Sequence, residues 1–184
     1  MNNGSNNHKH SVVHKHRVVI TGMGLITPLG HNVPDSWAAI KAGKSGVGDF
    51  VVLPKGEHEM GAICEVKDFD ADAYLGRRDA RRRDRFQQIA TVAAREAITH
   101  SGLEITEGNR ENIGITLGTG VGGIQTLVEQ EHIVMEKGLK RVSPFAITMI
   151  MPNGAAGMIA IDYGIHGPST TVTTACAAGC DAIG

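Results

Sequence analysis

The amino-acid sequence predicts an α/β fold, because short apolar runs alternate along it with longer segments of helical periodicity. The apolar runs are typical of buried strands and lie at 17–21, 113–117 and 170–175. Glycines directly follow the first two runs, as tight strand-to-helix turns require, and the 184 residues include 24 glycines. Strands of this kind, alternating with helices, indicate a largely buried sheet.

The first expected elements come from the N-terminal third. The run RVVIT (17–21) ends at a glycine and is expected to be a buried strand. A short helix is predicted to begin at Pro34 and Asp35 and to end at Gly43, where glycine is a common C-cap. Residues 43–76 carry many turn-forming residues, so we expect an irregular segment with one or two short strands.

The clearest expected helix runs from Asp84 to Ser101 and ends at Gly102. Its apolar residues recur at spacings of three and four, which makes one apolar face: Phe86, Ile89, Ala90, Ala93, Ala94, Ala97 and Ile98. Two further helices are expected at 124–137 and 152–163, with a break at 143–145 between them.

Composition and charge exclude several classes of protein. The net charge is −1, which provides no general attraction to nucleic acid or to an anionic membrane. No apolar run approaches the roughly 18 residues of a membrane-spanning helix, and no signal peptide is recognised. Three cysteines are too few for a disulfide framework, so we expect a cytoplasmic protein without a metal site or cofactor.

The first 16 residues are polar and rich in asparagine and histidine, so we expect a disordered tail at 1–16. Its histidines could bind a transition metal weakly: His8, His10, His14 and His16. Residues 17–184 are then expected to form one domain.

Cys176 is the candidate nucleophile, since it follows the predicted strand 170–175 and is expected to begin a helix. A turn of this kind exposes the sulfur, and a helix N-terminus favours the thiolate over the thiol. The alternative is a small, buried and inert cysteine. Cys180 and Cys64 form no metal-binding pattern, and we interpret both as structural.

Two glycine-rich segments, GMGLITPLG and GTGVGG, superficially resemble dinucleotide-binding loops. The dinucleotide fingerprint requires G-x-G-x-x-G opening a helix directly, but Thr27 occupies the third glycine position and Pro28 interrupts the start of a helix. Tight turns beside a packed sheet are the preferred interpretation.

The segment 77–85 contains six arginines in nine residues. Four of them can share a helical face: Arg78, Arg81, Arg82 and Arg85. The segment is interpreted either as a solvated face, balanced by Asp79 and Asp84, or as a docking patch for an anionic partner.

Five segments together carry a family resemblance: VVITGMGLITPLG, GTGVGG, SPFAITMIMPNGAAG, YGIHGPS and TTACAAGCDAIG. In this order they resemble the β-ketoacyl-acyl carrier protein synthases, in particular the type II condensing enzymes, and they cover residues 17–184. The resemblance implies a thiolase-like fold of two α/β halves, each with a five-stranded sheet. It also implies a homodimer that pairs through the strand Thr170–Ala175.

The resemblance implies a decarboxylative condensation in fatty acid synthesis. Cys176 would accept an acyl group from acyl carrier protein, and the carbanion from malonyl-carrier protein would then attack the thioester. The Cys176 N–H would provide one donor to the oxyanion.

Other residues have implied roles in the family. Val121, Ala146, Ile147 and Ala175 match positions at the acyl pocket, and Ala146 and Ile147 match residues that reach the partner subunit. The carrier-protein docking surface would contain Arg77, Arg78, Arg81 and Arg82.

The family's catalytic histidines lie in a C-terminal half that has no counterpart in these 184 residues. None of the histidines outside the tail matches the required motifs: His31, His58, His100, His132 and His166. We therefore expect an N-terminal half of a condensing enzyme, not fully active by itself. The alternative is a catalytically incomplete fragment or interaction subunit.

Overall fold

The computed structural model of the chain describes residues 17–48 and 63–184. The predicted tail at 1–16 lies outside the described residues, and so does part of the predicted irregular segment 43–76. In the described part of that segment, Gly48 and Ile63 form an isolated antiparallel bridge.

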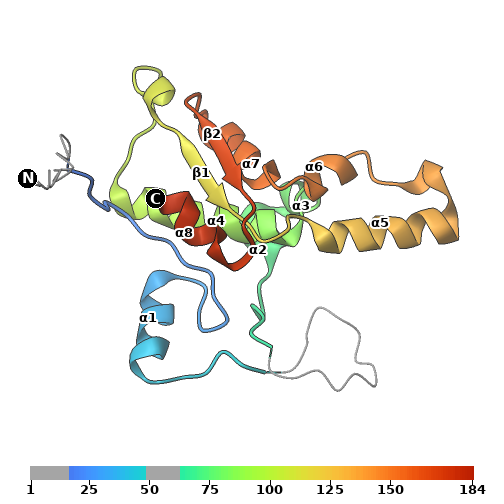
Figure 1. The fold of residues 1–184 in the computed structure, drawn as a ribbon, viewed down its shortest axis with the longest axis horizontal. Helices are drawn as coiled ribbons and strands as arrows, with labels where there is room; N and C mark the ends of the chain where they lie inside the picture. The colour runs from blue at the N-terminus through green and yellow to red at the C-terminus, as the bar shows by residue number, and fades with distance from the viewer. Residues whose placement is uncertain (1–16, 49–62) are drawn as a thin grey trace, which may run out of the picture.

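The described sheet consists of two parallel strands, β1 (Ile115–Gly118) and β2 (Ser169–Val172) (Figure 1). Residue 115 pairs with 169 and residue 118 with 172, so both strands end at the same edge of the sheet. These strands confirm the two later strand predictions, but β2 ends three residues before the expected position. The sheet is also less buried than predicted, since the first two residues of β2 are exposed.

The prediction of a strand at 17–21 is wrong for the described chain. Val18, Val19 and Ile20 are 95%, 66% and 83% exposed, and the segment forms no strand. β-Branched residues favour a strand only where a neighbouring strand provides hydrogen-bond partners and a surface to pack on. Among the described residues, no strand lies beside 17–21 to pair with it.

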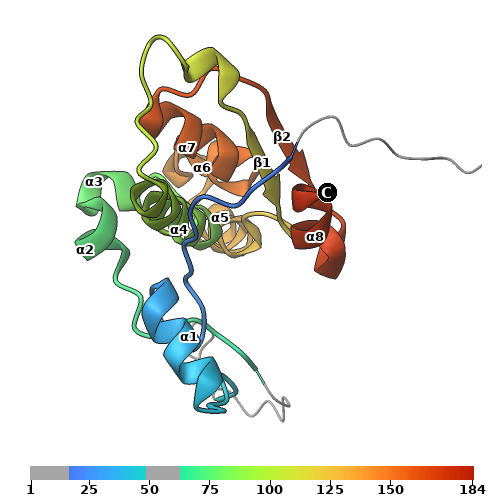
Figure 2. The same cartoon turned by 90° about the vertical axis from the view of Figure 1, so that its left-hand side faces the viewer.

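Helices lie on both sides of the sheet. The helix α7 (Gly154–Tyr163) packs against both strands and against α4 (Arg85–Ser101), whereas α8 (Ala178–Ile183) packs against the strands from the other side (Figure 2). Ala155 and Ala156 of α7 are fully buried, which allows the helix to approach closely. The resulting order of layers is α4, α7, sheet and α8.

The remaining elements connect these layers. The helix α1 (Val33–Lys41) projects from the body of the molecule, and α5 (Ile124–Lys137) extends along its other end (Figure 1). The shorter elements are α2 (Ala71–Leu75), α3 (Arg77–Ala80), α6 (Ala146–Ile150) and the 3₁₀ turns η1 (Arg110–Asn112), η2 (Leu139–Arg141) and η3 (Ala175–Ala177). No helix among the described residues has the length and apolar character needed to cross a membrane.

The helix α4 confirms the predicted span and its glycine end. Asp84 is the N-cap, and Gly102 ends the helix in the left-handed conformation with φ of 65°. The buried positions are nevertheless Gln87, Thr91 and Val92 rather than the predicted apolar face, whose members are only half-buried. Polar side chains at the centre of the packing must therefore be satisfied by hydrogen bonds.

One of these polar contacts is a partly buried ion pair between Arg83, in the loop before α4, and Asp162 of α7. Arg83 donates to both carboxylate oxygens of Asp162, at 2.7 and 2.6 Å, and to the Thr91 hydroxyl at 3.0 Å. The Arg83 side chain is 5% exposed and that of Asp162 is 29% exposed. A bidentate pair of this kind fixes orientation as well as distance.

Replacing Asp162 by alanine is expected to lower the free energy of unfolding by about 2 to 3 kcal/mol, because it leaves the Arg83 charge buried without its partner. Urea unfolding followed by circular dichroism measures this loss. The matched control is Glu107→Ala, which removes an exposed ion pair with Arg110 and should cost less than about 0.5 kcal/mol. Equal effects of the two variants would contradict the structural role of the buried pair.

Gly118→Ala is expected to displace α8, because a Cβ at Gly118 would lie 2.1 Å from the Ala178 carbonyl oxygen. We expect a loss of at least about 1 kcal/mol in stability and a changed rate of alkylation at Cys176, measured by site-resolved mass spectrometry. Gly120→Ala is the control, since nothing lies within 4 Å of a Cβ there. An unchanged alkylation rate and stability in Gly118→Ala would show that α8 does not depend on this close approach.

Candidate functional site

The two loops that carry the predicted site residues leave the sheet at the same edge. Parallel strands β1 and β2 end at Gly118 and Val172, so the loop 119–123 and the turn 173–177 begin side by side. The close approach of Gly118 to Ala178 confirms that the end of β1 contacts the start of α8. Crevices at the carboxyl ends of parallel strands are common ligand sites in α/β proteins.

Cys176 lies at the centre of η3, in the sharp turn between β2 and α8, and is exposed. Its exposure argues against the alternative of an inert core cysteine. Ala175 has a φ of 50°, an uncommon conformation for a residue with a side chain, and local strain of this kind is often found at functional turns. The prediction that strand 170–175 leads directly into a helix at Cys176 is corrected, because the backbone turns at Thr174 and α8 begins only at Ala178.

Hydrogen bonds hold the two sides of this turn together. The Ala177 N–H donates to the Thr174 carbonyl at 3.1 Å, and the Thr174 hydroxyl donates to the Asp181 carboxylate in α8. Within the described residues, the N–H of Cys176 donates no hydrogen bond. This N–H is therefore available to a ligand. Because α8 has only six residues, its dipole is weak. The turn, rather than the helix, determines the position of Cys176.

The other predicted pocket residues differ in exposure. Val121 in the loop after β1 is 64% exposed, and Ile147 in α6 is 68% exposed. Ala146 is 4% exposed, so of the pair in α6 only Ile147 presents its side chain at the surface. Ala175 is exposed beside Cys176. The described chain does not enclose these apolar side chains.

A buried polar cluster that the sequence did not reveal positions these segments. The Asp84 carboxylate caps α4 at the Phe86 N–H with one oxygen, and with the other accepts hydrogen bonds from the N–H (3.0 Å) and hydroxyl (2.6 Å) of Thr126. Gln87 donates to the Thr148 carbonyl of α6 at 2.7 Å. The start of α4 thereby fixes both the first turn of α5, directly after the loop 119–123, and the helix α6.

The arginine segment divides into two groups. Arg83 and Arg85 turn inward, to Asp162 and to the Val66 carbonyl, so Arg85 does not share the predicted exposed face. Asp84 is buried and does not balance a solvated face. The other four arginines line a hollow of about 700 Å³, together with the break before α6: Arg77, Arg78, Arg81, Arg82, Ser143, Pro144 and Phe145.

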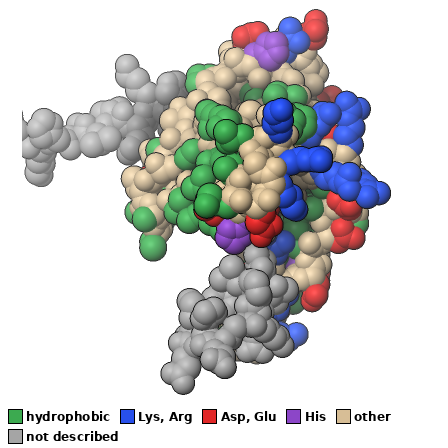
Figure 3. Space-filling model, turned by 90° about the vertical axis from the view of Figure 1, so that its right-hand side faces the viewer, with side chains coloured by type: hydrophobic (Ala, Val, Ile, Leu, Met, Phe, Trp, Pro, Cys, Tyr) green, Lys and Arg blue, Asp and Glu red, His purple; other side chains and the backbone are tan. Residues whose placement is uncertain are grey.

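The four predicted docking arginines thus face one surface feature. Arg77, Arg78 and Arg81 are exposed, and Arg82 is half-buried over the Phe145 ring, with 4.9 Å from its guanidinium carbon to the ring centroid. Figure 3 shows Lys and Arg side chains gathered beside a hydrophobic patch on the face that it draws. A hollow with several cations and few anions suits an acidic ligand or protein surface.

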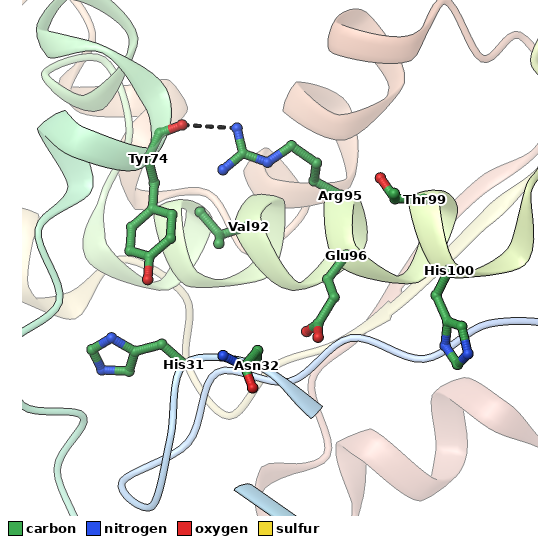
Figure 4. Close-up of a pocket in the computed structure, with 8 residues that line it drawn as sticks. All are labelled: His31, Asn32, Tyr74, Val92, Arg95, Glu96, Thr99 and His100. Atoms are coloured by element: carbon green, nitrogen blue, oxygen red, sulfur yellow. Dashed lines mark hydrogen bonds between the residues drawn. The ribbon is translucent and has the colours of Figure 1, made fainter. Parts of the chain in front are cut away.

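A second hollow, of about 470 Å³, lies between α4 and the loop around His31 (Figure 4). Its polar groups mostly contact the protein itself. Glu96 accepts the N–H groups of Leu25 and Val33, each at 2.8 Å, and the Arg95 guanidinium donates to the Tyr74 carbonyl. We interpret this hollow as the place where α4 anchors the N-terminal loop.

The glycines of GMGLITPLG also allow the N-terminal loop to pack closely on α4. A Cβ at Gly22 or Gly24 would lie 2.2 Å from the Ala97 carbonyl oxygen or 1.9 Å from that of Ala93. In GTGVGG, Gly123 similarly lies against the Met149 carbonyl, where a Cβ would be 2.2 Å away. These glycines permit close packing on helices, whereas the expectation was tight turns beside a packed sheet.

The described histidines all contact groups other than Cys176. Their partners are the Lys67 carbonyl for His31, the Met23 N–H for His100, Glu131 for His132 and Glu111 for His166. His58 lies outside the described residues. Among the residues that the structure describes, no three metal-binding side chains come together. Cys64 and Cys180 are exposed like Cys176, so exposure alone does not distinguish the nucleophile.

Comparison with known sequences identifies the family. The model of the β-ketoacyl synthase N-terminal domain matches residues 15–184. A 3-oxoacyl-[acyl-carrier-protein] synthase 2 of Synechocystis sp. is 43% identical over 170 residues, which are 92% of this chain and 41% of the relative. The synthase of the same name from Staphylococcus aureus is 39% identical over 168 residues, 91% of this chain and 41% of the relative.

Solved structures agree in fold. A type II polyketide ketosynthase in complex with its acyl-carrier protein superposes with a TM-score of 0.72 at 25% identity, over 90% of this chain and 44% of that chain. The ishigamide ketosynthase/chain length factor superposes with a TM-score of 0.74 at 27% identity, over 85% of this chain and 39% of that chain. The architecture is therefore thiolase-like, and the chain spans about two fifths of the length of the curated relatives it matches. From its matched motifs and its fold, the chain belongs to the β-ketoacyl synthase family.

Proposed function

We propose that this chain provides the acyl-accepting cysteine and the carrier-docking surface of a β-ketoacyl-acyl carrier protein synthase of fatty acid synthesis. The observation that carries the proposal is the exposed Cys176 in a turn at the carboxyl edge of the sheet, in a chain of this family. The relatives named 3-oxoacyl-[acyl-carrier-protein] synthase 2 support this assignment.

The loading step forms one thioester and breaks another. The Cys176 thiolate attacks the thioester carbonyl of acyl-carrier protein, and the free Cys176 N–H stabilises the oxyanion that develops. The tetrahedral intermediate collapses with departure of the carrier's thiolate, which takes up a proton. The acyl chain would then lie beside the exposed apolar residues Val121 and Ala175, and Ile147 would reach the pocket of the partner subunit.

The condensation step returns the cysteine to its free form. Malonyl-carrier protein loses carbon dioxide, and the resulting carbanion attacks the carbonyl of the acyl-Cys176 thioester. The new carbon–carbon bond forms as the Cys176 thiolate leaves. In the described part of the chain, the histidines contact groups other than Cys176.

The four-arginine hollow is the proposed docking surface for the carrier protein. A ketosynthase with similar fold has been solved in complex with its acyl-carrier protein. Acyl carrier proteins are acidic, so complementary charge accelerates encounter and fixes orientation. Arg77, Arg78 and Arg81 are exposed and line the hollow together with the half-buried Arg82, which supports this proposal.

The free edge of β2 supports the proposal of a homodimer. Within the described residues β2 pairs only with β1, so its second edge is open to an equivalent strand of a partner subunit. The pairing segment would be Ser169–Val172, the observed strand within the predicted Thr170–Ala175 region. A cytoplasmic location remains a prediction from the cysteine content.

A second candidate is a catalytically incomplete interaction subunit of a condensing enzyme. Two observations support this candidate. No described histidine contacts Cys176, and the chain is similar in structure to a ketosynthase/chain length factor. Condensation by the 184-residue chain alone would exclude this candidate.

Acyl loading tests the central chemical proposal. After the folded chain is mixed with acyl-carrier protein, intact mass spectrometry should show one added acyl group, which Cys176→Ala abolishes. Cys180→Ala is the matched control, because Cys180 is exposed one helical turn further on and should load normally. Loading that persists in Cys176→Ala would contradict the assignment of the nucleophile.

Charge reversal tests the docking surface. The double variant Arg78→Glu/Arg81→Glu is expected to weaken carrier binding roughly tenfold, and the effect should shrink as salt is raised. Lys44→Glu, an exposed cation near α1, is the control and should bind normally. Isothermal titration calorimetry at two salt concentrations measures the carrier affinity of each variant and its dependence on salt. Equal affinities for the two variants would place the docking surface elsewhere.

A further inference from the structure

One arginine of the docking hollow differs from the other three in its contact. Arg82 lies over the Phe145 ring at 4.9 Å and is half-buried, whereas Arg77, Arg78 and Arg81 are exposed. A guanidinium stacked on an aromatic face gains more when it is partly desolvated. The hollow therefore connects, at its inner wall, to the aromatic residue that immediately precedes α6.

Phe145 is joined to α6 by its backbone. Its carbonyl accepts hydrogen bonds from the Met149 N–H and the Thr148 hydroxyl, both at 2.9 Å. The helix has only five residues and no side-chain cap at its N-terminus. The Phe145 N–H also donates to the Ser143 hydroxyl at 3.2 Å, and Gln87 holds the Thr148 carbonyl. A displacement of Phe145 therefore acts on α6 through backbone hydrogen bonds, against these restraints.

The C-terminal end of α6 contacts the loop after β1. The Gly123 N–H donates to the Ile150 carbonyl at 3.1 Å, and a Cβ at Gly123 would lie 2.2 Å from the Met149 carbonyl oxygen. This loop contains Val121 and leaves the sheet at the same edge as the Cys176 turn. A continuous series of direct contacts thus links the arginine hollow to the edge where Cys176 lies.

We infer that Arg82 and Phe145 are a positioning pair through which an acidic partner bound in the hollow moves α6 and the loop 119–123 beside Cys176. The inference rests on the proposed function, in which that partner is the acyl carrier protein. A carboxylate of the partner competes with the ring for the Arg82 guanidinium. When the guanidinium leaves the ring, Phe145 loses one of the contacts that orient the start of α6, and Val121 changes its surroundings.

The test is methyl NMR of Val121, titrated with apo-carrier protein that lacks its prosthetic arm. Without the arm, only the acidic surface of the carrier can act on the chain. Saturating apo-carrier protein should shift the Val121 methyl resonances of the wild-type chain. Phe145→Leu, which keeps an apolar side chain but removes the ring, should bind with similar affinity and lose more than half of this shift. Phe145→Tyr restores the ring and should restore the shift.

Arg81→Ala is the matched control, because Arg81 lines the same hollow and is exposed rather than stacked on Phe145. It should weaken binding but give the full Val121 shift at saturation. A full shift in saturated Phe145→Leu would overturn the inference.

The free chain separates this inference from the docking proposal. Without any partner, Arg82→Ala should move the Val121 resonances and Arg81→Ala should not. If apo-carrier protein fails to bind the wild-type chain, the docking proposal is wrong, while these two variants still decide whether the pair controls the loop. Identical Val121 resonances in Arg82→Ala and in the wild type would overturn the inference regardless of docking.

Discussion

The arrangement of the site depends on the buried carboxylate of Asp84. One of its oxygens caps α4, and the other accepts two hydrogen bonds from Thr126 at the start of α5. A carboxylate that is 5% exposed must have its oxygens satisfied, because an unpaired buried charge is costly. Donors from two helices meet this requirement, so one side chain fixes the relative position of α4 and α5.

Its neighbours extend the same constraint to other layers. Arg83 holds Asp162 of α7, and α7 supports the sheet whose edge carries Cys176. Gln87 is fully buried and holds the Thr148 carbonyl of α6. Three residues within one helical turn of sequence therefore position α5, α6 and α7, while the four arginines just before them remain at the surface for a partner.

Helices with strong local signals could be predicted from the sequence. The helix α5 has the predicted bounds, and α4 has the predicted cap and glycine end, because periodicity and capping are local properties. The turn at Cys176 was also predictable, although the backbone bends earlier than β-branched Thr173 and Thr174 suggest. The positive φ of Ala175 has no signal in the sequence, since alanine does not favour it.

The polar core could not be predicted. The sequence does not show which of the six arginines in the segment 77–85 is buried. Only the tertiary fold turns Arg83 toward Asp162, 79 residues away in the chain. The sequence carries no signal for the burial of Gln87 and Thr91, because buried polar residues break the apolar pattern that identifies a core. The prediction of a strand at 17–21 was wrong because strand propensity is realised only beside a neighbouring strand, which the described residues do not provide.

Hydrogen exchange of Asp84→Asn tests the central role of this carboxylate most directly. An asparagine keeps the size of the side chain and can still cap α4 through its oxygen. Its amide nitrogen donates where the second carboxylate oxygen accepts, so the hydrogen bond from the Thr126 N–H is lost. We predict faster amide exchange at Thr126 and in α6, with exchange in α1 unchanged. Exchange that is unaltered at Thr126 and in α6, or accelerated equally in α1, would contradict the conclusion that Asp84 positions the segments around Cys176.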